Sequence, residues 1–169
     1  MQSQSDQISV DAGFASHDHH ACITTGLEKA ETHCQKAGLR LTPARRRVLE
    51  ILLEAHRAIG AYDILDRLRD EGRGAQPPVV YRALDFLTAH GLAHKIERLN
   101  AFIACSHTGA SHAPAFLICR ECGRVSEAEI APDAGELGQA AARAGFAIER
   151  AVREAVGLCP LCSKDAPTP

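Results

Sequence analysis

The chain has 169 residues, a formal net charge of −2 and 46% hydrophobic residues. This length suits one ordinary domain or two small ones, and small domains often need metal ions or dimerisation for stability. No apolar run approaches the about 20 residues that span a bilayer, and the polar N-terminus lacks the features of a signal peptide, so we expect a cytoplasmic protein with no membrane partner. Seven cysteines in that compartment indicate metal or redox chemistry rather than disulfides.

Charge is distributed unevenly along the chain. Residues 36–98 hold 12 Lys and Arg against 8 Asp and Glu, whereas residues 106–169 hold 6 against 8. A basic first half and an acidic second half predict that nucleic acid, a polyanion, contacts the first half alone.

The first 22 residues predict a disordered tail. It contains a His-rich tract made of His17, His19 and His20. A solvated tail is preferred over an accessory metal site, because a short polar tract cannot form a packed core.

Four helices are expected in the basic half. Thr25 and Glu28 have the spacing of a capping box, which predicts the start of the first helix. Thr42 followed by Pro43 predicts a second start, because Thr caps a helix and Pro suits its first position. The third and fourth helices follow from apolar residues at helical spacing. Their expected ranges are about 61–70 and 78–90, the latter opened by Pro77 and Pro78.

Two short strands are expected next, at about 92–97 and 101–105. Helices followed by a β-hairpin are the winged-helix order, in which the second helix of a helix-turn-helix pair enters the major groove. The predicted recognition helix is therefore 78–90, and its exposed face carries Tyr81 and Arg82.

A second small unit is expected after residues 106–114, which are small and polar and predict a hinge. Strands at about 115–119 and 125–130, a helix at about 133–144 and a last strand within 146–158 predict an α+β dimerisation module. The apolar residues of its helix are expected to point inward: Leu137, Ala140, Ala141 and Ala144. The expected units are a tail (1–22), a winged-helix domain (23–105), the hinge (106–114), a dimerisation domain (115–163) and a second tail (164–169).

The strongest signal is a pair of CxxC motifs, Cys119 with Cys122 and Cys159 with Cys162, separated by 36 residues. Four thiolates match the closed tetrahedral geometry of structural zinc, and the long gap requires an inserted helix and strand. The alternative is a set of free or redox-active cysteines, as in a thiol oxidoreductase. A thioredoxin-like CxxC begins a helix, whereas Cys122 precedes Gly123 and a strand pattern, so we favour structural zinc.

A second, looser group of residues also has metal-binding side chains: His94, Cys105, His112 and Glu127. Each also has an ordinary explanation, as a surface histidine, a buried thiol or a solvated carboxylate, so spacing alone leaves a shared site open. Enzyme motifs such as HExxH, the P-loop and GxSxG do not occur in the sequence. We therefore expect neither an enzyme nor a small-molecule substrate.

Three runs of sequence, together with both CxxC motifs, resemble the ferric uptake regulator superfamily over about residues 25–162. The runs are Leu41-Thr-Pro-Ala-Arg45, Ala61-Tyr-Asp-Ile-Leu65 and Pro77-Pro-Val-Val-Tyr-Arg-Ala-Leu-Asp-Phe-Leu87. The resemblance implies an α+β chain with a winged-helix DNA-binding domain and a small dimerisation domain.

Within this superfamily the chain is most similar to the zinc uptake regulators. Shared features are a His-Lys pair with a Cys eleven residues after the His, a His seven residues before the first CxxC, and a Glu five residues after its second Cys. The resemblance implies that four residues bind a regulatory Zn²⁺: His94, Cys105, His112 and Glu127. The stretch from Cys105 to His112 is a residue shorter than this branch leads us to expect, so His107 is a candidate substitute.

An iron- or peroxide-responsive member of the superfamily is the alternative. Iron-sensing members usually carry a dense His-His-Asp-His cluster before the first CxxC, where this sequence has the separated His107 and His112. A ligand set of thiolate and imidazole also suits zinc better than ferrous iron.

The resemblance thus implies a homodimeric repressor that binds operator DNA when loaded with zinc and controls zinc uptake genes. Two Zn²⁺ per chain are expected, one structural and one regulatory, and the regulatory ion would fix the angle between the two domains. Bases are expected to contact Tyr81 and Arg82, and phosphates to contact Tyr62 and the Arg45–Arg47 cluster. A zinc-stapled interaction protein that has lost DNA binding is the remaining alternative.

Overall fold

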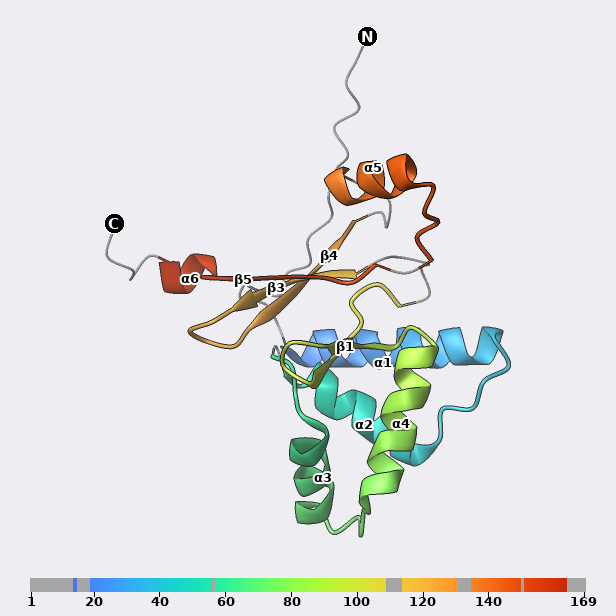
Figure 1. Cartoon of the computed structure of the whole chain (residues 1–169). Helices are drawn as coiled ribbons and strands as arrows, with labels where there is room; N and C mark the ends of the chain where they lie inside the picture. The colour runs from blue at the N-terminus through green and yellow to red at the C-terminus, as the bar shows by residue number, and fades with distance from the viewer. Residues whose placement is uncertain are drawn as a thin grey trace.

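The computed structural model describes residue 14 and residues 19–55, 57–108, 114–130, 135–149 and 151–163. The helices of the first half of the chain gather below a three-stranded sheet, and a two-stranded hairpin lies between these helices and the sheet (Figure 1). The predicted α+β fold is therefore confirmed. Within the described residues, every helix is too short or too polar to cross a membrane.

Helix α1 (His19–Lys36) begins before the predicted capping box at Thr25. Ile23 packs against the apolar core, so tertiary contact stabilises the helix upstream of the predicted start. The Thr24 hydroxyl donates to the carbonyl oxygen of His20 at 3.0 Å, a bond that satisfies a polar side chain within a helix. The predicted start is wrong, and α1 overlaps the segment assigned to a tail.

Helix α2 (Pro43–Leu53) starts where the sequence predicts. Thr42 is its N-cap, and the Thr42 side chain accepts the backbone N–H of Arg45 at 3.4 Å. Helices α3 (Ala61–Asp70) and α4 (Pro77–Ala89) also lie where they are expected, with prolines in the first positions of α4.

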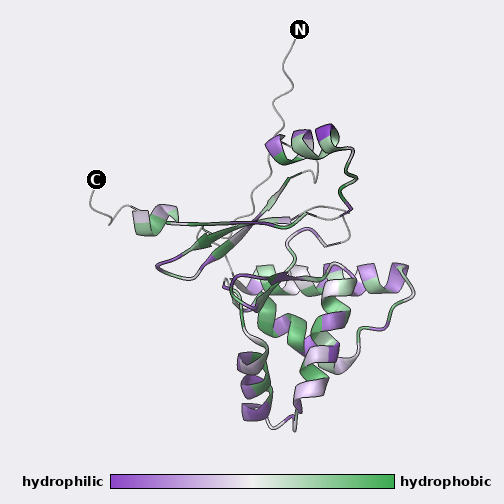
Figure 2. Cartoon of the chain, viewed as in Figure 1, coloured by the Kyte–Doolittle hydropathy of each residue, from purple (hydrophilic) through white to green (hydrophobic). Residues whose placement is uncertain are grey.

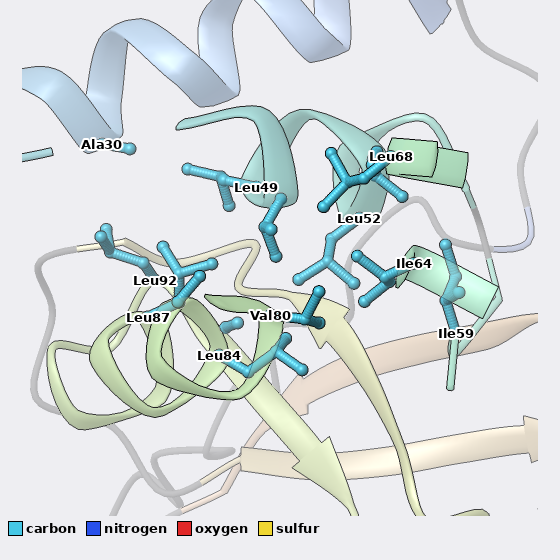
Figure 3. Packing of buried hydrophobic residues seen from close by; sticks show 14 of the residues in the cluster. Ala30, Leu49, Leu52, Ile59, Ile64, Leu68, Val80, Leu84, Leu87 and Leu92 are labelled. Atoms are coloured by element: carbon cyan, nitrogen blue, oxygen red, sulfur yellow. The ribbon is translucent and has the colours of Figure 1, made fainter. Parts of the chain in front are cut away.

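The four helices enclose the main apolar core. Side chains from α2 and α4, such as Leu49 and Leu84, point toward one another, and Ile64 of α3 closes one side (Figure 3). Figure 2 shows the same division, with hydrophobic residues facing inward and hydrophilic residues on the outer turns of α3. Each fully buried side chain of this kind contributes about 1.5–3 kcal/mol to folding.

The hairpin consists of β1 (Ala93–Ile96) and β2 (Ala101–Ala104), paired antiparallel. Asn100 adopts a φ of 45° in the turn, a left-handed conformation that Asn tolerates better than most residues. A bridge between Ile59 and Phe102 ties β2 to the segment before α3. Helices and hairpin together form the predicted winged-helix order.

The C-terminal sheet has the strand order β4-β3-β5. Strand β3 (Pro114–Cys119) pairs antiparallel with β4 (Val125–Glu129) and parallel with β5 (Arg153–Gly157). A parallel neighbour requires a crossover connection, and here that connection contains α5 (Gly135–Ala144). The short α6 (Pro160–Ser163) follows β5. The C-terminal ends of β3 and β5 therefore lie side by side.

Helix α5 does not bury the apolar stripe predicted for it. Its residues are all exposed or partly exposed in the described chain, and Leu137 is 54% exposed. In Figure 1 the helix lies beyond the end of β4 rather than over the sheet. The expectation of inward-pointing side chains within one chain is therefore wrong for all four residues: Leu137, Ala140, Ala141 and Ala144.

The hairpin and the C-terminal sheet share a second apolar cluster. It is formed by Ile96, Ile103, Phe116, Ile118 and Val125. The first two belong to the hairpin and the others to the sheet or its edge, so the two parts of the chain are in direct contact. Residues 109–113 of the predicted hinge lie outside the described residues.

Replacing Leu84 by Ala should lower the free energy of unfolding by about 2–5 kcal/mol, because this side chain is completely buried in the main core. Leu99→Ala, in the exposed hairpin turn, is the matched control and should change it by less than about 0.5 kcal/mol. Chemical denaturation of the metal-loaded protein measures both values. Equal losses in the two variants would contradict the assignment of the core.

Candidate metal centres and nucleic-acid interface

The four cysteines of the CxxC motifs meet at one end of the C-terminal sheet, with their sulphur atoms all within 4.8 Å of one another. Sγ of Cys122 lies 3.8 Å from Sγ of Cys159. Two sulphurs of a tetrahedron with zinc–sulphur bonds of about 2.3 Å are separated by about 3.8 Å. The parallel β3–β5 pairing explains the convergence, because Cys119 ends β3 opposite Gly157, just before Cys159. A zinc ion fits this donor set.

Main-chain amides prepare this cysteine cluster for thiolates. Backbone N–H groups of Cys122 and Cys159 donate to the sulphur of Cys119 and lower the pKa of that thiol to about 6. A side-chain hydrogen bond with Cys159 raises the pKa of Cys162 to about 12. Thiols with a lowered and a raised pKa thus lie side by side, and a bound zinc ion would favour the thiolate form of all four cysteines.

A second cluster of metal-binding side chains lies between the hairpin and the C-terminal sheet. His94 on β1, Cys105 after β2 and Glu127 on β4 bring their donor atoms within 4.8 Å of one another. Oε1 of Glu127 is 3.2 Å from Nε2 of His94 and 4.0 Å from Sγ of Cys105. Imidazole, thiolate and carboxylate are all zinc ligands, so this cluster, here called the bridging cluster, fits a zinc ion.

The Glu127 carboxylate is only 1% exposed. An ionised carboxylate in such a place is costly unless hydrogen bonds or a cation compensate for the lost water. The backbone N–H of Ser106 donates to Oε2 of Glu127 at 2.9 Å. This bond orients the carboxylate, so that its other oxygen lies toward His94 and Cys105.

The thiol of Cys105 is held in its neutral form. Burial, followed by the neighbouring Glu127 carboxylate, raises the pKa of Cys105 to about 12. A divalent cation reverses this preference, because it compensates both the thiolate and the carboxylate. The bridging cluster thus has the electrostatic character of a site that is completed by a cation.

Two histidines were candidates for a further ligand of the bridging cluster. Nδ1 of His107 lies 3.9 Å from Oε1 of Glu127, so His107 borders the cluster. His112 lies outside the described residues. The structure brings together three of the predicted regulatory ligands, and the role of His112 stays a prediction.

The exposed face of α4 carries the residues predicted to contact bases. Tyr81 and Arg82 are exposed, while the opposite face of the helix, which includes Leu84, is buried. Tyr62 on α3 is 67% exposed. Tyr62, Tyr81 and Lys95 line one hollow of about 620 Å³. The hollow also contains Asp85 and Glu97, and Lys95 is paired with Glu97 at 2.8 Å, so its hydrogen-bond donors toward DNA are the two aromatic hydroxyls.

The arginines of α2 do not form one free basic patch. Arg47 pairs with Glu50, Glu54 and Glu71 at 3.0, 2.8 and 2.6 Å, and Arg46 also pairs with Glu50. Carboxylates of the same chain compensate these charges, and contact of Arg46 and Arg47 with DNA phosphates stays a prediction.

Arg45 differs from its two neighbours. Its guanidinium carbon lies 3.7 Å from the ring centroid of Phe86 in α4, a cation–π contact, and its Nη1 donates to the carbonyl oxygen of Arg40 at 2.7 Å. These contacts hold the cation beside α4, and its contact with DNA phosphate stays a prediction.

Two residues that shape this region were not singled out from the sequence. Ser106 acts through its main-chain N–H, for which residue type carries no signal. Glu154 interrupts the apolar pattern of the last strand, and its carboxylate contacts the hairpin. A charged residue inside an apolar strand was the available signal for Glu154.

Comparison with known proteins gives a consistent result. A model of the Ferric uptake regulator family matches residues 36–151. The zinc uptake regulation protein of Escherichia coli (strain K12) is 43% identical over 138 residues, which are 80% of this chain and 80% of that protein. A solved structure of a zinc uptake regulator complexed with zinc and DNA has a TM-score of 0.77 at 41% identity, over 85% of this chain and 96% of that one.

Two solved structures of XcZur differ in how well they superpose. Holo XcZur has a TM-score of 0.72 at 40% identity, over 83% of this chain and 98% of that one. Apo XcZur has a TM-score of 0.50 at 39% identity, over 85% and 99%. Since identity and coverage are nearly equal, the difference reflects spatial arrangement, and this chain has an arrangement closer to that of holo XcZur.

Cys119→Ser should release one tightly held zinc ion per chain and lower the melting temperature, because a structural zinc contributes folding free energy. Zinc counted per chain after dialysis against a mild chelator, together with a thermal melt, measures both effects. Cys34→Ala, on the buried face of α1 and outside both clusters, is the control and should keep the full zinc content. Full zinc retention in Cys119→Ser would exclude this cysteine as a ligand.

Proposed function

This chain belongs to the ferric uptake regulator family, and from that membership we propose that it is a zinc-responsive transcriptional repressor. It binds operator DNA as a zinc-loaded homodimer and controls genes of zinc uptake and homeostasis. Its place of action is the cytoplasm, where operator DNA is accessible, and its role is regulation, with no catalysis and no small-molecule substrate.

One observation carries this proposal: the bridging cluster takes His94 and Cys105 from the hairpin and Glu127 from the C-terminal sheet. A zinc ion held by all three must fix the hairpin relative to the sheet. The closer likeness to holo than to apo XcZur supports the same reasoning. Zinc in that position would determine the relative orientation of the two domains when the chain binds DNA.

The ligand chemistry favours zinc over iron. A thiolate, such as that of Cys105, is a soft ligand that suits Zn²⁺, whereas ferrous iron sensing relies on nitrogen- and oxygen-rich sets. The relative from Escherichia coli is a zinc uptake regulation protein by name. An iron- or peroxide-responsive role is therefore not favoured.

Two zinc ions per chain would have different roles. The cysteine cluster (Cys119, Cys122, Cys159 and Cys162) takes all its ligands from the end of β3, the turn after it and the segment that follows β5, all within the C-terminal unit, which suits a permanent structural ion. The bridging cluster, with His112 as its further ligand and His107 as a substitute, takes ligands from two parts of the chain. An ion there can bind and leave as these parts close and open, which suits a sensor.

On DNA, α4 is the proposed recognition helix. The Arg82 guanidinium can donate two hydrogen bonds to O6 and N7 of guanine in the major groove, and Tyr81 can contact a thymine methyl group or a phosphate. Tyr62 and Arg45 are proposed to contact the phosphate backbone, which fixes the position of the helix.

Exposed apolar residues of the C-terminal unit support a homodimer. They include Leu137, Phe146, Val152 and Val156. A second copy that covers them would place two α4 helices across a two-fold axis. Their separation must then match half-sites about 34–36 Å apart, or a multiple of that spacing.

Zinc acts on a population of arrangements in this proposal. The winged-helix domain (23–105) and the dimerisation domain (115–163) are joined by the hinge (106–114). Without the regulatory ion the two domains sample many angles, few of which match the operator. Zinc stabilises the closed arrangement only to the extent that it binds the closed form more tightly than the open form.

Cys105→Ser should abolish zinc-dependent operator binding and leave a folded dimer that retains its structural zinc. The measurement is binding to a duplex selected by the wild-type chain from a random pool, at several buffered concentrations of free zinc. We expect affinity at least about tenfold lower at zinc levels that saturate the wild type, a loss of about 1.4 kcal/mol. The exposed Cys22→Ser is the control and should behave as wild type.

Two outcomes would contradict this account. If Cys105→Ser unfolds, Cys105 is structural rather than regulatory. If the wild-type chain, stripped of its exchangeable ion, holds the selected duplex as firmly as the loaded chain, then zinc does not control DNA binding.

Arg82→Ala should weaken binding to the selected duplex by about 1–3 kcal/mol and change binding to unrelated duplex far less, since a bidentate contact with guanine discriminates between bases. Arg143→Ala on α5, far along the chain from the recognition helix, is the charge-matched control and should leave both affinities unchanged. A uniform loss on all duplexes would assign Arg82 to phosphate contact instead.

A further inference from the structure

The turn of the hairpin is held against the C-terminal sheet by one side chain. Oε1 of Glu154 accepts the backbone N–H of Glu97 at 2.7 Å, and Oε2 accepts that of Arg98 at 3.1 Å. Glu154 lies on β5, whereas Glu97 and Arg98 begin the turn between β1 and β2. Both oxygens of one carboxylate are thus bonded to the main chain of the other domain.

The arrangement is that of an anion bound by consecutive backbone amides. Successive N–H groups in a turn form a small concave site for negative charge, and hydrogen bonds to a charged acceptor are stronger than neutral ones. The Glu97 side chain is paired with Lys95 at 2.8 Å. Glu154 therefore contacts the main chain of the turn and not the Glu97 side chain. The contact depends on the conformation and position of the turn.

This tether is continuous with the bridging cluster. Glu154 lies opposite Phe116 in the parallel register of β5 with β3. Phe116 packs with Ile96 of the hairpin, and its ring centroid lies 5.6 Å from that of His94. Neighbouring positions in the sheet, followed by the packing of Phe116, therefore lead from the tether to a proposed zinc ligand.

We propose that Glu154 is a positioning residue that favours the closed arrangement of the two domains and thereby sets the free zinc concentration at which the chain binds DNA. The proposal rests on the proposed function. Glu154 acts through the hairpin, because it holds the strand that carries His94 against the sheet that carries Glu127.

The tether affects the closed arrangement alone. When the hairpin leaves the sheet, water takes the place of the two amides on the Glu154 carboxylate, so these bonds contribute only to the closed form. The apparent affinity for zinc falls in proportion to the population of the binding-competent form. Loss of the tether should therefore raise the zinc requirement without removing any zinc ligand.

The test compares Glu154→Ala, Glu154→Gln and the exposed control Glu149→Gln in the full chain, with operator binding titrated against buffered free Zn²⁺. Glu154→Ala should raise the zinc midpoint about tenfold, as expected for losing charge-assisted bonds of a partly exposed group. Glu154→Gln keeps a hydrogen-bond acceptor but no charge and should raise the zinc midpoint less. Glu149→Gln should leave the zinc midpoint unchanged. At saturating zinc, all variants should bind the operator as wild type does.

Hydrogen exchange gives a readout that does not involve DNA. In the zinc-loaded wild type the amides of Glu97 and Arg98 should exchange slowly, and in Glu154→Ala they should exchange several-fold faster. Amides of the main core, such as that of Leu84, should be unaffected. Unchanged protection of the two turn amides would overturn the proposal.

The outcomes separate this inference from the proposed function. A wild-type zinc midpoint in Glu154→Ala overturns the role of Glu154, while zinc-dependent binding by the wild type leaves the repressor function intact. Zinc-independent binding by the wild type overturns the repressor function itself. If Glu154→Ala lowers the melting temperature, Glu154→Gln at wild-type stability decides, with a raised midpoint supporting the tether and an unchanged one overturning it.

Discussion

The buried carboxylate of Glu127 is the constraint on which the arrangement of the two domains depends. It lies on the C-terminal sheet, yet its partners come from the other part of the chain: His94, Cys105 and the N–H of Ser106. A buried negative charge is tolerated only while such partners surround it. Burial and this same carboxylate raise the pKa of Cys105 to about 12, so the carboxylate that contacts both parts of the chain also favours a cation between them.

The two metal-binding clusters differ because of where their residues lie in the fold. Pairing of β3 with β5 places the cysteine cluster at one end of a single sheet, since Cys119 and Gly157 are neighbours in it. Backbone amides already lower the pKa of Cys119 to about 6. The bridging cluster has no such framework of its own, and its residues meet only when hairpin and sheet meet. The cysteine cluster is therefore suited to a structural role, and the bridging cluster to sensing the metal concentration.

Local signals in the sequence predicted local structure well. Thr42 marked a helix start because capping is a property of a few adjacent residues. Both CxxC motifs predicted a metal site, and the structure brings their four sulphur atoms together. Signals that depend on distant partners were harder to interpret. The start of α1 was missed because Ile23 packs against the core, a contact that the local sequence does not show. Leu137 was predicted to be buried, but it is exposed in the single chain. The tether of Glu154 involves main-chain amides 57 and 56 positions away, which no local pattern encodes.

The link from metal to DNA follows from how the hairpin is joined to α4. The backbone N–H of Leu92 donates to the carbonyl oxygen of Leu87 in the last turns of α4 at 2.8 Å, and the N–H of Cys105 donates to the carbonyl oxygen of Leu92 at 3.0 Å. Leu87 and Leu92 are also buried in the same core cluster. Packed interiors of this kind move as units rather than deforming gradually. These contacts join Cys105 to α4, the helix that carries Arg82, and they are the route by which an ion at the bridging cluster would fix α4 relative to the C-terminal sheet.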